Sequence, residues 1–433
     1  MPKSQPIYPE QAFRPDVIRF TDIPVCQYNK TLEEEKKNYT KDDFMRIYHD
    51  MRTIREFEHM LNEVKTKGAY GGIEYNYPGP AHLSIGQEAS AVGQAFPLDI
   101  NDLSFGSHRS HGEIIARGLV AIHKLPENEL YDIMKNFLGG RILSIVEKHM
   151  PADNIKKLAQ NFLLYGALAE VFARSTGFNL GLGGSMHCFF IPFGLMPNNA
   201  IVGGSAPIAV GAALYKRCNG KPGIVIANIG DGALGRGSVL EAMNFASMDQ
   251  FTKLWGMDGK YSDKGLPILF NIFNNIYGMG GQTWGETAGY GYAARLGAGF
   301  TPTQMHSERV NGYDPLAVID AVSRKKQILL EGKGPALLDI VTYRVSGHSP
   351  SDSSSYRSQE EIDAWIAADP IAAFRKKLVE GSIATEDEFD AIDEMIVRRT
   401  EEIMRLATND EISPRMDLDK EPDAIANLMF SNQ

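Results

Sequence analysis

Short apolar runs alternate along the chain with longer amphipathic segments. Three runs rich in aliphatic and β-branched residues, each bounded by Gly or Pro, predict buried parallel strands at 223–229, 266–273 and 335–342. Amphipathic periodicity predicts helices around them. Thr40 followed by Asp43 marks the start of a long helix, which a glycine-rich stretch at Gly68 ends. This alternation predicts an α/β fold with a doubly wound, mostly parallel sheet.

The segments outside these strands are expected to be mostly helical. Residues 85–123 indicate a helix, a strand and a second helix, and residues 126–174 are strongly helical. Residues 177–204 are rich in Gly and Asn and predict a loop region, after which a helix of small residues follows. Two Ser/Thr-x-x-Glu patterns, Ser358 to Glu361 and Thr385 to Glu388, predict capping boxes in a helical C-terminal region.

Composition narrows the class of partner and the compartment. The 433 residues are 43% hydrophobic and 23% charged, which is ordinary for a globular protein. The net charge of −10 argues against nucleic acid or an anionic membrane surface as a partner. No apolar run approaches the roughly 18 residues of a membrane-spanning helix. Three widely spaced cysteines suggest small, buried, reduced thiols, and the first residues match no targeting pattern, so we expect a cytoplasmic protein.

Polar residues follow two of the predicted strands at their carboxyl ends. Gly230-Asp231-Gly232 comes after the first strand, and Asn274-Asn275 comes after the second. Since the carboxyl ends of parallel strands form the ligand-binding edge of an α/β sheet, these side chains should lie together. A carboxylate and an amide oxygen suit Mg²⁺ or Ca²⁺, and Mg²⁺ usually shares its ligands with a phosphate. The pattern favours a phosphorylated cofactor.

Two other interpretations of the first motif remain open at this point. Residues 230–235 also match G-x-G-x-x-G after a strand, which would indicate NAD or FAD. Against this, Asp231 between the glycines would repel a pyrophosphate unless a cation lay between them. A plain tight turn that needs glycine is the third possibility. The second motif, with its paired asparagines, favours the metal.

Further motifs accompany these two: Ile85-Gly-Gln-Glu-Ala, His108-Arg109-Ser-His111-Gly, Gly183-Gly-Ser-Met-His187, Ile201-Val-Gly and Tyr343-Arg-Val-Ser-Gly-His-Ser. From about Thr40 to about Thr408 the chain resembles the α subunit of the thiamine-diphosphate-dependent 2-oxo acid dehydrogenases, the E1 component. The resemblance implies a thiamine-diphosphate-binding fold. It also implies decarboxylation of a 2-oxo acid and transfer of the acyl group to a lipoyl group on an E2 acyltransferase.

The same resemblance assigns a metal and part of the cofactor site. Asp231, the Asn275 side chain and the Tyr277 carbonyl would hold Mg²⁺ against the diphosphate. The amides of Gly232 and Ala233 would donate to it, as amides at the start of a helix can. Thiamine diphosphate and Mg²⁺ are therefore the expected cofactors.

Further cofactor contacts are implied at four positions. Arg109 matches a diphosphate-binding arginine, and His108 stands where the family commonly has a tyrosine. The resemblance also implies cofactor contacts for Ala200, directly before the Ile201-Val-Gly motif, and for Val202, which would touch the aminopyrimidine ring. The alternative for Arg109 is a surface ion pair, which is the less favoured interpretation.

Two histidines match active-site residues of the family. His111 and His348 are the candidates for proton transfer and for holding the lipoyl or carboxylate group. His348 would also flank the cofactor. Without the resemblance, a histidine in a loop is more often merely exposed. Residues 185–187 match the family too, in a role as easily structural as catalytic.

The chain departs from the family in length at two places. Asp231 and Asn275 are 44 positions apart, a longer spacing than the family has, which suggests a loop insertion at about 251–265. A helical insertion is expected at about 125–164. The remaining division is an N-terminal arm at 1–39 over a neighbouring surface, an α/β domain at 40–358 and a C-terminal helical extension at 359–433.

In this family the glutamate that activates the cofactor comes from a separate β subunit or from a fused C-terminal half, and the sequence after residue 408 does not resemble a second α/β domain. We therefore expect an α₂β₂ heterotetramer, with an E1 β subunit, a lipoyl-bearing E2 partner and a small 2-oxo acid substrate. Rival interpretations are an acetoin dehydrogenase, a transketolase-like aldehyde transfer with the same cofactor, or a non-catalytic α-like assembly subunit.

Overall fold

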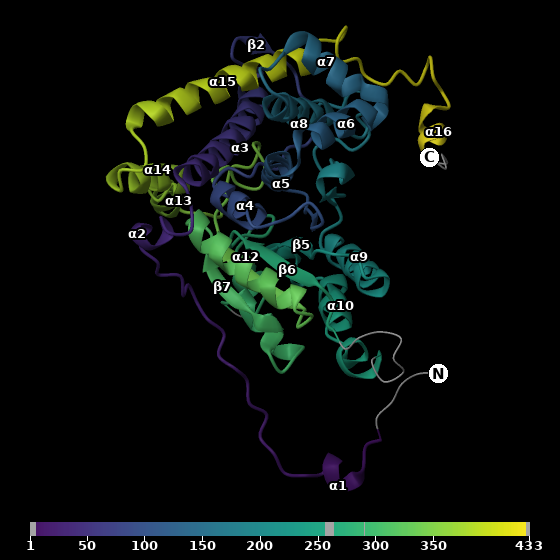
Figure 1. Ribbon diagram of the computed structural model, residues 1–433, viewed down its shortest axis with the longest axis vertical. Coiled ribbons are helices and arrows are strands. Elements are labelled where there is room, and N and C mark those ends of the chain that lie inside the picture. Colours follow the sequence, from purple (N-terminus) through teal and green to yellow (C-terminus); the bar gives the residue numbers. More distant parts are fainter. Residues whose placement is uncertain (1–5, 256–263, 290, 430–433) are drawn as a thin grey trace.

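The computed structural model describes residues 6–255, 264–289 and 291–429 (Figure 1). Residues 256–263 of the predicted loop insertion at 251–265 lie outside the described residues. The chain before them ends in a short helical segment, η4 (Gln250–Leu254).

The centre of the fold is a six-stranded, all-parallel sheet in the order β4-β3-β5-β6-β8-β7. Its strands are β3 (Leu103–Phe105), β4 (Leu195–Met196), β5 (Val225–Gly230), β6 (Ile268–Asn274), β7 (Glu308–Asn311) and β8 (Ala336–Val341). A separate antiparallel hairpin consists of β1 (Ala69–Tyr70) and β2 (Ile73–Glu74). The predicted α/β fold and its three central strands, β5, β6 and β8, are confirmed. β4 and β7 were not predicted, because they are edge strands without a buried apolar run.

The helices of the N-terminal half are α1 (Pro9–Ala12), α2 (Leu32–Glu35), α3 (Lys41–Lys67), α4 (Glu88–Ala95), α5 (His111–Lys124), α6 (Glu127–Asn136), α7 (Arg141–His149) and α8 (Ile155–Val171). Those that follow are α9 (Ser205–Asn219), α10 (Gly237–Ala246), α11 (Thr283–Glu286), α12 (Pro315–Leu330), α13 (Gln359–Ala367), α14 (Pro370–Glu380), α15 (Glu386–Thr408) and α16 (Ala424–Met429). Short segments are η1 (Phe137–Gly140), η2 (Ile191–Phe193), η3 (Asp231–Ala233), η6 (Ala293–Gly299) and η7 (Gln304–His306).

Helices cover both faces of the sheet, because alternate residues of each strand point to opposite sides. On one face Val225 and Ala227 pack with α9 and α10, whereas on the other Ile226 and Leu269 pack with α12. A second body of helices, α3, α5, α8 and α15, forms the largest apolar core and lies above the sheet in Figure 1. α15 crosses its outer side and packs on α3 and α8.

Helix ends follow the sequence at most places and differ at one. Thr40 and Asp43 form the predicted capping box, and Gly68, with φ 71°, ends α3 in the left-handed region. Thr385 and Glu388 form a second box at the start of α15. The box predicted at Ser358 forms only in part, because the Glu361 carboxylate does not return to the Ser358 amide.

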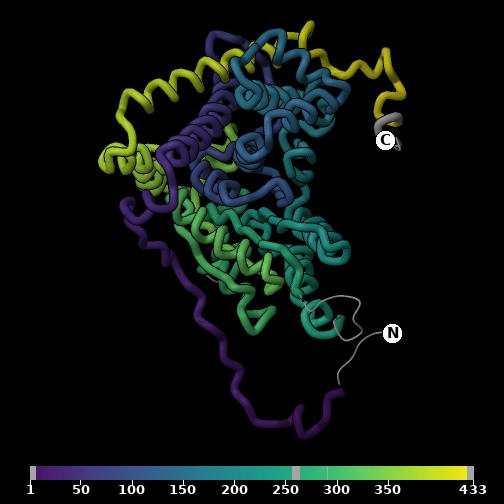
Figure 2. The backbone as a smooth tube through the Cα atoms, viewed as in Figure 1, coloured from purple at the N-terminus to yellow at the C-terminus, as the bar shows by residue number. Residues whose placement is uncertain are grey.

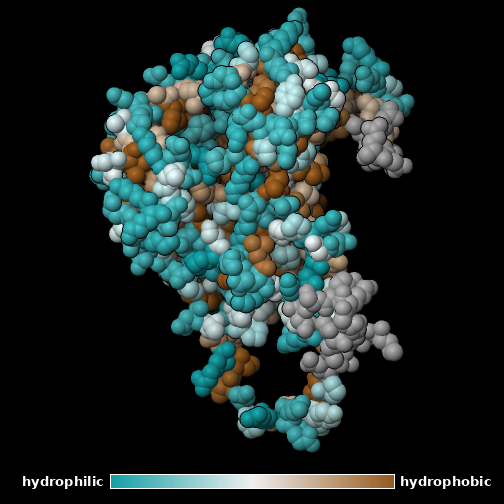
Figure 3. Space-filling model, viewed as in Figure 1, coloured by the Kyte–Doolittle hydropathy of each residue, from teal (hydrophilic) through white to brown (hydrophobic). Residues whose placement is uncertain are grey.

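The N-terminal segment extends away from the body as an arm (Figure 2). It meets the sheet where Cys26 N donates to Arg309 O at 2.8 Å and Arg309 N donates to Pro24 O at 2.9 Å, which pairs it with the edge strand β7. Several apolar side chains of the arm are exposed, among them Ile7, Phe13, Val17, Ile18 and Phe20. In Figure 3 brown atoms are visible on the part of the chain below the body. Such a concentration of exposed apolar groups is typical of a segment that packs on another surface.

Two remaining sequence expectations can be compared with the structure. Among the described residues, no helix has the length and apolar character required to cross a bilayer. The three cysteines are free, but only Cys188 is buried; Cys26 is exposed and Cys218 is partly exposed, so their prediction as buried apolar groups holds for one of three.

Two helical glycines are predicted to change stability in opposite directions when replaced by alanine. Gly118 lies in α5, which packs against α8, and Gly211 lies in α9. A Cβ at Gly118 would lie 2.5 Å from the Leu163 side chain, whereas a Cβ at Gly211 in α9 would have no heavy atom within 4 Å. We expect Gly118→Ala to lower the free energy of unfolding by about 1–3 kcal/mol through overpacking. Gly211→Ala should raise it by about 0.5–1 kcal/mol through helix propensity. Urea denaturation followed by circular dichroism measures both, and equal effects would contradict the packing argument.

Candidate active site

A cavity of about 460 Å³ lies at the carboxyl ends of β5 and β6. Ten of the eleven residues singled out from the sequence line it: His108, Arg109, Ala200, Val202, Asp231, Gly232, Ala233, Asn275, Tyr277 and His348. The eleventh, His111, does not. The edge of the sheet thus brings together residues that are separated by up to 240 positions in the chain, as expected for an α/β ligand site.

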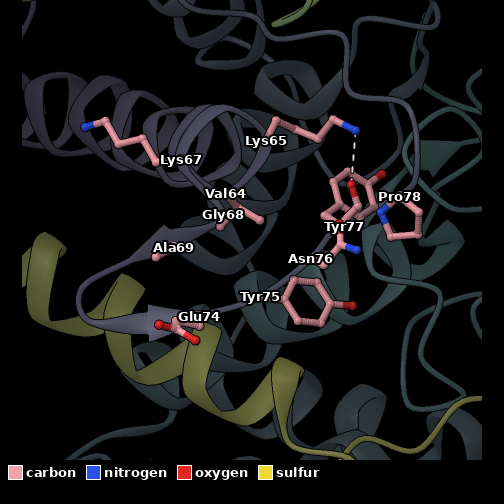
Figure 4. Close-up of a pocket in the computed structure, with 10 residues that line it drawn as sticks. All are labelled: Val64, Lys65, Lys67, Gly68, Ala69, Glu74, Tyr75, Asn76, Tyr77 and Pro78. Carbon is pink, nitrogen blue, oxygen red and sulfur yellow. Dashed lines mark hydrogen bonds between the residues drawn. The ribbon is translucent and has the colours of Figure 1, made fainter.

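A second cavity, of about 640 Å³, lies beside the β1–β2 hairpin at the end of α3 (Figure 4). None of the residues singled out from the sequence lines it. Its Lys65 Nζ already donates to the carbonyls of Tyr77 and Gly79 at 3.0 and 2.9 Å, and Lys67 pairs with Glu63. We therefore take the cavity at the sheet edge as the candidate site.

One side of the site consists of oxygen atoms that could coordinate a cation, grouped around a buried carboxylate. Asp231 is 1% exposed and directly follows β5. Its carboxylate accepts hydrogen bonds from the main-chain nitrogen of Asn275 at 3.3 Å and from the Thr283 hydroxyl. Burial raises the pKa of Asp231 to about 6, although the hydrogen bonds from Thr283 and Asn275 oppose the shift. A cation beside this carboxylate would offset the cost of its burial.

The other oxygen atoms near Asp231 suit Mg²⁺ better than a transition metal. The Asn275 side-chain nitrogen donates to Gln87 Oε1 at 3.1 Å, and its oxygen, which accepts from Tyr277 N at 3.4 Å, is the end that can also coordinate a cation. No group of three His, Cys, Asp or Glu side chains that could hold a metal occurs among the described residues. A metal here must therefore take one carboxylate, amide and main-chain oxygens, and oxygens of its ligand. Mg²⁺ with a phosphate commonly uses such a set.

The turn after β6 has a strained backbone. Ile276, between Asn275 and Tyr277, has φ 74°, which a β-branched residue rarely adopts. Two hydrogen bonds hold the turn: Thr283 N donates to Ile276 O at 2.8 Å, and Gly278 N donates to Gly281 O at 2.8 Å. Strain of this kind persists only where the surroundings fix it, and it is common at functional sites.

The opposite side of the cavity is cationic. Arg109, which is 5% exposed, donates to Leu83 O at 2.8 Å and to His348 O at 2.9 Å. Burial and the neighbouring Arg344 lower the pKa of Arg109 to about 9, so it remains charged at neutral pH. In the described parts of the chain, neither the Arg109 guanidinium nor the Arg344 guanidinium forms an ion pair with a carboxylate. Two unpaired guanidinium groups suit a diphosphate.

Three histidines lie next to these arginines. The ring centroids of His82 are 4.8 Å from His108 and 5.0 Å from His348, and the latter two are 6.0 Å apart. Burial, followed by the charge of Arg109, lowers the pKa of His82 to about 3, of His108 to about 2 and of His348 to about 4. All three are neutral near pH 7. Because Arg344 Nη1 lies 3.3 Å from His348 Nδ1, this nitrogen accepts and the His348 proton is on Nε2.

His111 lies behind the cavity, at the start of α5. Its side chain is buried, with Nδ1 3.1 Å from Glu58 Oε1 and Nε2 2.8 Å from Ser185 Oγ. Both ring nitrogens therefore have protein partners, and His111 links α3 and α5 to the loop at 183–187. Its role in proton transfer stays a prediction.

Sequence reasoning missed several residues that contact the site. His82, Gln87, Thr283 and Arg344 are the closest of them to the predicted groups. His82, Gln87 and Arg344 stand in or beside the motifs at 85–89 and 343–349, and this was the signal available. Thr283 stands in no motif. A buried Glu113 also underlies the cavity: Asn228, which lines it, donates to Glu113 Oε2 at 2.7 Å, and burial raises the pKa of Glu113 to about 8.

The fold and this cavity define an α/β protein suited to an anionic, phosphorylated ligand held through a divalent cation. The family model described as "Dehydrogenase E1 component" matches residues 156–415. The chain is 30% identical to the mitochondrial pyruvate dehydrogenase E1 component subunit alpha of Chaetomium thermophilum, over 98% of this chain and 84% of the relative. The corresponding subunit of Schizosaccharomyces pombe gives the same identity and coverage. That of Rickettsia bellii is 28% identical over 85% of this chain and 92% of the relative.

This chain belongs to the dehydrogenase E1 component family and is an alpha subunit of a 2-oxo acid dehydrogenase E1, an oxidoreductase. The rival functions are not favoured by these relatives. The prediction of a cytoplasmic protein is wrong as it was argued. Relatives that match 98% of this chain are named as mitochondrial, so composition and an N-terminal pattern do not fix the compartment.

The three neutral histidines predict a pH dependence of stability. Their folded-state pKa values lie below the ordinary 6.5, so the unfolded state binds more protons below that pH. Their contribution is therefore complete above about pH 6.5 and is lost as the pH falls toward 4. We expect His108→Gln to make the fall in unfolding free energy between pH 7 and 5 shallower. The same change at exposed His149 is the control, and equal slopes for the two variants would exclude this origin.

Proposed function

We propose that this alpha subunit binds thiamine diphosphate through Mg²⁺ in the cavity at the sheet edge and, with a β subunit, decarboxylates pyruvate. Members of this family generally use thiamine diphosphate. The observation that carries the proposal is the division of one cavity into an oxygen-donor side at Asp231 and a cationic side at Arg109 and Arg344. Pyruvate is proposed because the relatives are named as pyruvate dehydrogenase subunits. The acyl group then passes to a lipoyl group on an E2 acyltransferase.

The residues divide the work as follows. Asp231, the Asn275 oxygen and the Tyr277 carbonyl would hold Mg²⁺, and the amides of Gly232 and Ala233 would donate to the diphosphate. When bound, thiamine diphosphate supplies the nucleophile for the 2-oxo acid carbonyl and the electron sink for loss of CO₂.

On the other side of the cavity, Arg109 and His108 would bind the diphosphate, whereas Ala200 and Val202 would contact the aminopyrimidine. Neutral His348 would donate from Nε2 to a nearby anionic oxygen, since its Nδ1 faces Arg344. Its second predicted task, holding or moving a proton, uses the same nitrogen.

An apolar surface beside the cavity supports a protein partner. Ile201 is 73% exposed at the rim, and Ile208 and Tyr215 on α9 and Phe245 on α10 are also exposed. Such a patch marks an interaction site. We propose that an E1 β subunit covers it in an α₂β₂ heterotetramer. The arm at 1–39 then packs on a neighbouring subunit, outside an α/β domain at 40–358 and a helical extension at 359–433.

Substrate turnover by the α–β complex tests the proposal. Ferricyanide reduction is measured with and without thiamine diphosphate and Mg²⁺, across pyruvate, branched-chain 2-oxo acids, 2-oxoglutarate and acetoin. We expect cofactor-dependent turnover of pyruvate in preference to the others. Turnover of acetoin alone, or silence on every substrate with the cofactor bound, would contradict it.

The metal assignment has its own test. Asp231→Asn keeps the shape of the side chain but removes the charge that a cation requires. We expect at least a roughly 100-fold loss of activity, because charge stabilisation by a metal is worth several kcal/mol. Calorimetric binding of Mg²⁺ in the presence of thiamine diphosphate should weaken in parallel. Asp249→Asn, in an exposed pair with Lys253 just after α10, is the matched control and should change neither quantity.

A further inference from the structure

The same helix-start motif behaves differently at its two occurrences in the C-terminal extension. At the start of α15, Thr385 N donates to Glu388 Oε2 at 3.0 Å and Glu388 N donates to Thr385 Oγ1 at 3.3 Å, so both halves of the capping box form. At the start of α13, Glu361 N donates to Ser358 Oγ at 3.1 Å, but the Glu361 carboxylate makes no return contact. α13 therefore lacks half of a stabilising cap that its sequence could form.

The Glu361 carboxylate instead binds two tyrosines of the active-site region. The Tyr277 hydroxyl lies 2.8 Å from each carboxylate oxygen, and the Tyr343 hydroxyl donates to Oε1 at 2.9 Å. Both tyrosines are buried, at 3% and 0% exposure. Where a local rule is broken to make another contact, a functional reason is a common cause.

These two tyrosines belong to opposite sides of the site. Tyr277 lies in the strained turn after β6, and its main-chain carbonyl is the one proposed to bind the metal. Tyr343 directly precedes Arg344, which faces His348 on the cationic side. Behind them, Trp365 of α13 stacks on Tyr343 with ring centroids 4.9 Å apart and an interplanar angle of 4°. One helix of the extension thus contacts both sides at once.

An arginine joins the same cluster. The Arg357 guanidinium lies 5.1 Å from the Tyr343 ring centroid and 5.7 Å from that of Tyr277, and it donates to Arg344 O at 2.7 Å. The segment after β8 is consequently attached to the turn after β6 through aromatic rings, and Glu361 is the shared acceptor of both hydroxyl groups.

We propose that Glu361 is a positioning residue that fixes the turn at Tyr277 and the segment at Arg344 relative to each other, so that the cation and the diphosphate bind as one unit. The inference rests on the proposed function. Glu361 acts on the ligands only through Tyr277 and Tyr343. Replacing Glu361 should reduce the free energy of cation binding by more than it reduces the free energy of unfolding.

Cation binding to the α–β complex tests this role. Mn²⁺ replaces Mg²⁺ as the probe, and electron paramagnetic resonance measures free Mn²⁺ at saturating thiamine diphosphate. We expect Glu361→Ala to raise the Kd for Mn²⁺ about 10–100-fold, the usual effect of losing a residue that orients metal ligands. Glu360→Ala removes the same charge from the same helical turn at an exposed position and should leave the Kd within twofold.

A double-mutant cycle separates positioning from a general loss of structure. Tyr277→Phe removes only the hydroxyl and should raise the Kd for Mn²⁺ in the same direction. The double variant with Glu361→Ala should bind no more weakly than Glu361→Ala alone, because the Tyr277 hydroxyl bond is already lost when Glu361 is replaced. Additive effects, or a Glu361→Ala complex that binds like Glu360→Ala, overturn the inference. A wild-type complex that binds no Mn²⁺ with the cofactor would instead overturn the proposed function.

Discussion

The burial of the Asp231 carboxylate is the constraint on which the rest of the site depends. A charge removed from water is costly unless it is paired or bonded, and among the described residues the hydrogen-bond partners of the Asp231 carboxylate are the Thr283 hydroxyl and main-chain amides. Burial therefore raises the pKa of Asp231. The strained turn at Ile276 brings further oxygen atoms to the same place, rather than a cationic side chain. The protein thereby keeps a buried carboxylate that the proposed cation would pair.

The cationic side presents the opposite imbalance. Burial and the charge of Arg344 lower the pKa of Arg109, burial and the charge of Arg357 lower that of Arg344, and burial followed by the arginine charges keeps the neighbouring His348 neutral. Each side alone is electrostatically unfavourable, but a cation bound to a diphosphate complements both. A ligand that binds only the folded state stabilises it, so the strain on the two sides makes binding and folding interdependent.

The sequence was sufficient where function and structure are local. Strands β5, β6 and β8 were predictable because central parallel strands are continuous apolar runs, and β7 was not, because its Glu308 and Arg309 give no such run. The residues of the site were predictable where they stand in motifs. His111 lies in such a motif, yet the fold turns it away from the cavity to Glu58 and Ser185. No pattern in one sequence reveals such contacts, since Glu58 is 53 positions away.

Glu361 shows why a correct local rule can still mislead. Its spacing from Ser358 is that of a capping box. The tyrosines that donate hydrogen bonds to its carboxylate, Tyr277 and Tyr343, are 84 and 18 positions away. Hydroxyl donors at a buried site compete well with a backbone amide at an exposed helix end, because a hydrogen bond to a charged acceptor is stronger where water is excluded. The same argument applies to the cavity as a whole. Its rim at Ile201 and Val202 is open and apolar, so a partner that covers it would exclude water and strengthen every charge interaction inside. The exposed rim and the buried charges are therefore consistent with the proposed β subunit: if it covers the rim, the charges on both sides of the cavity interact more strongly.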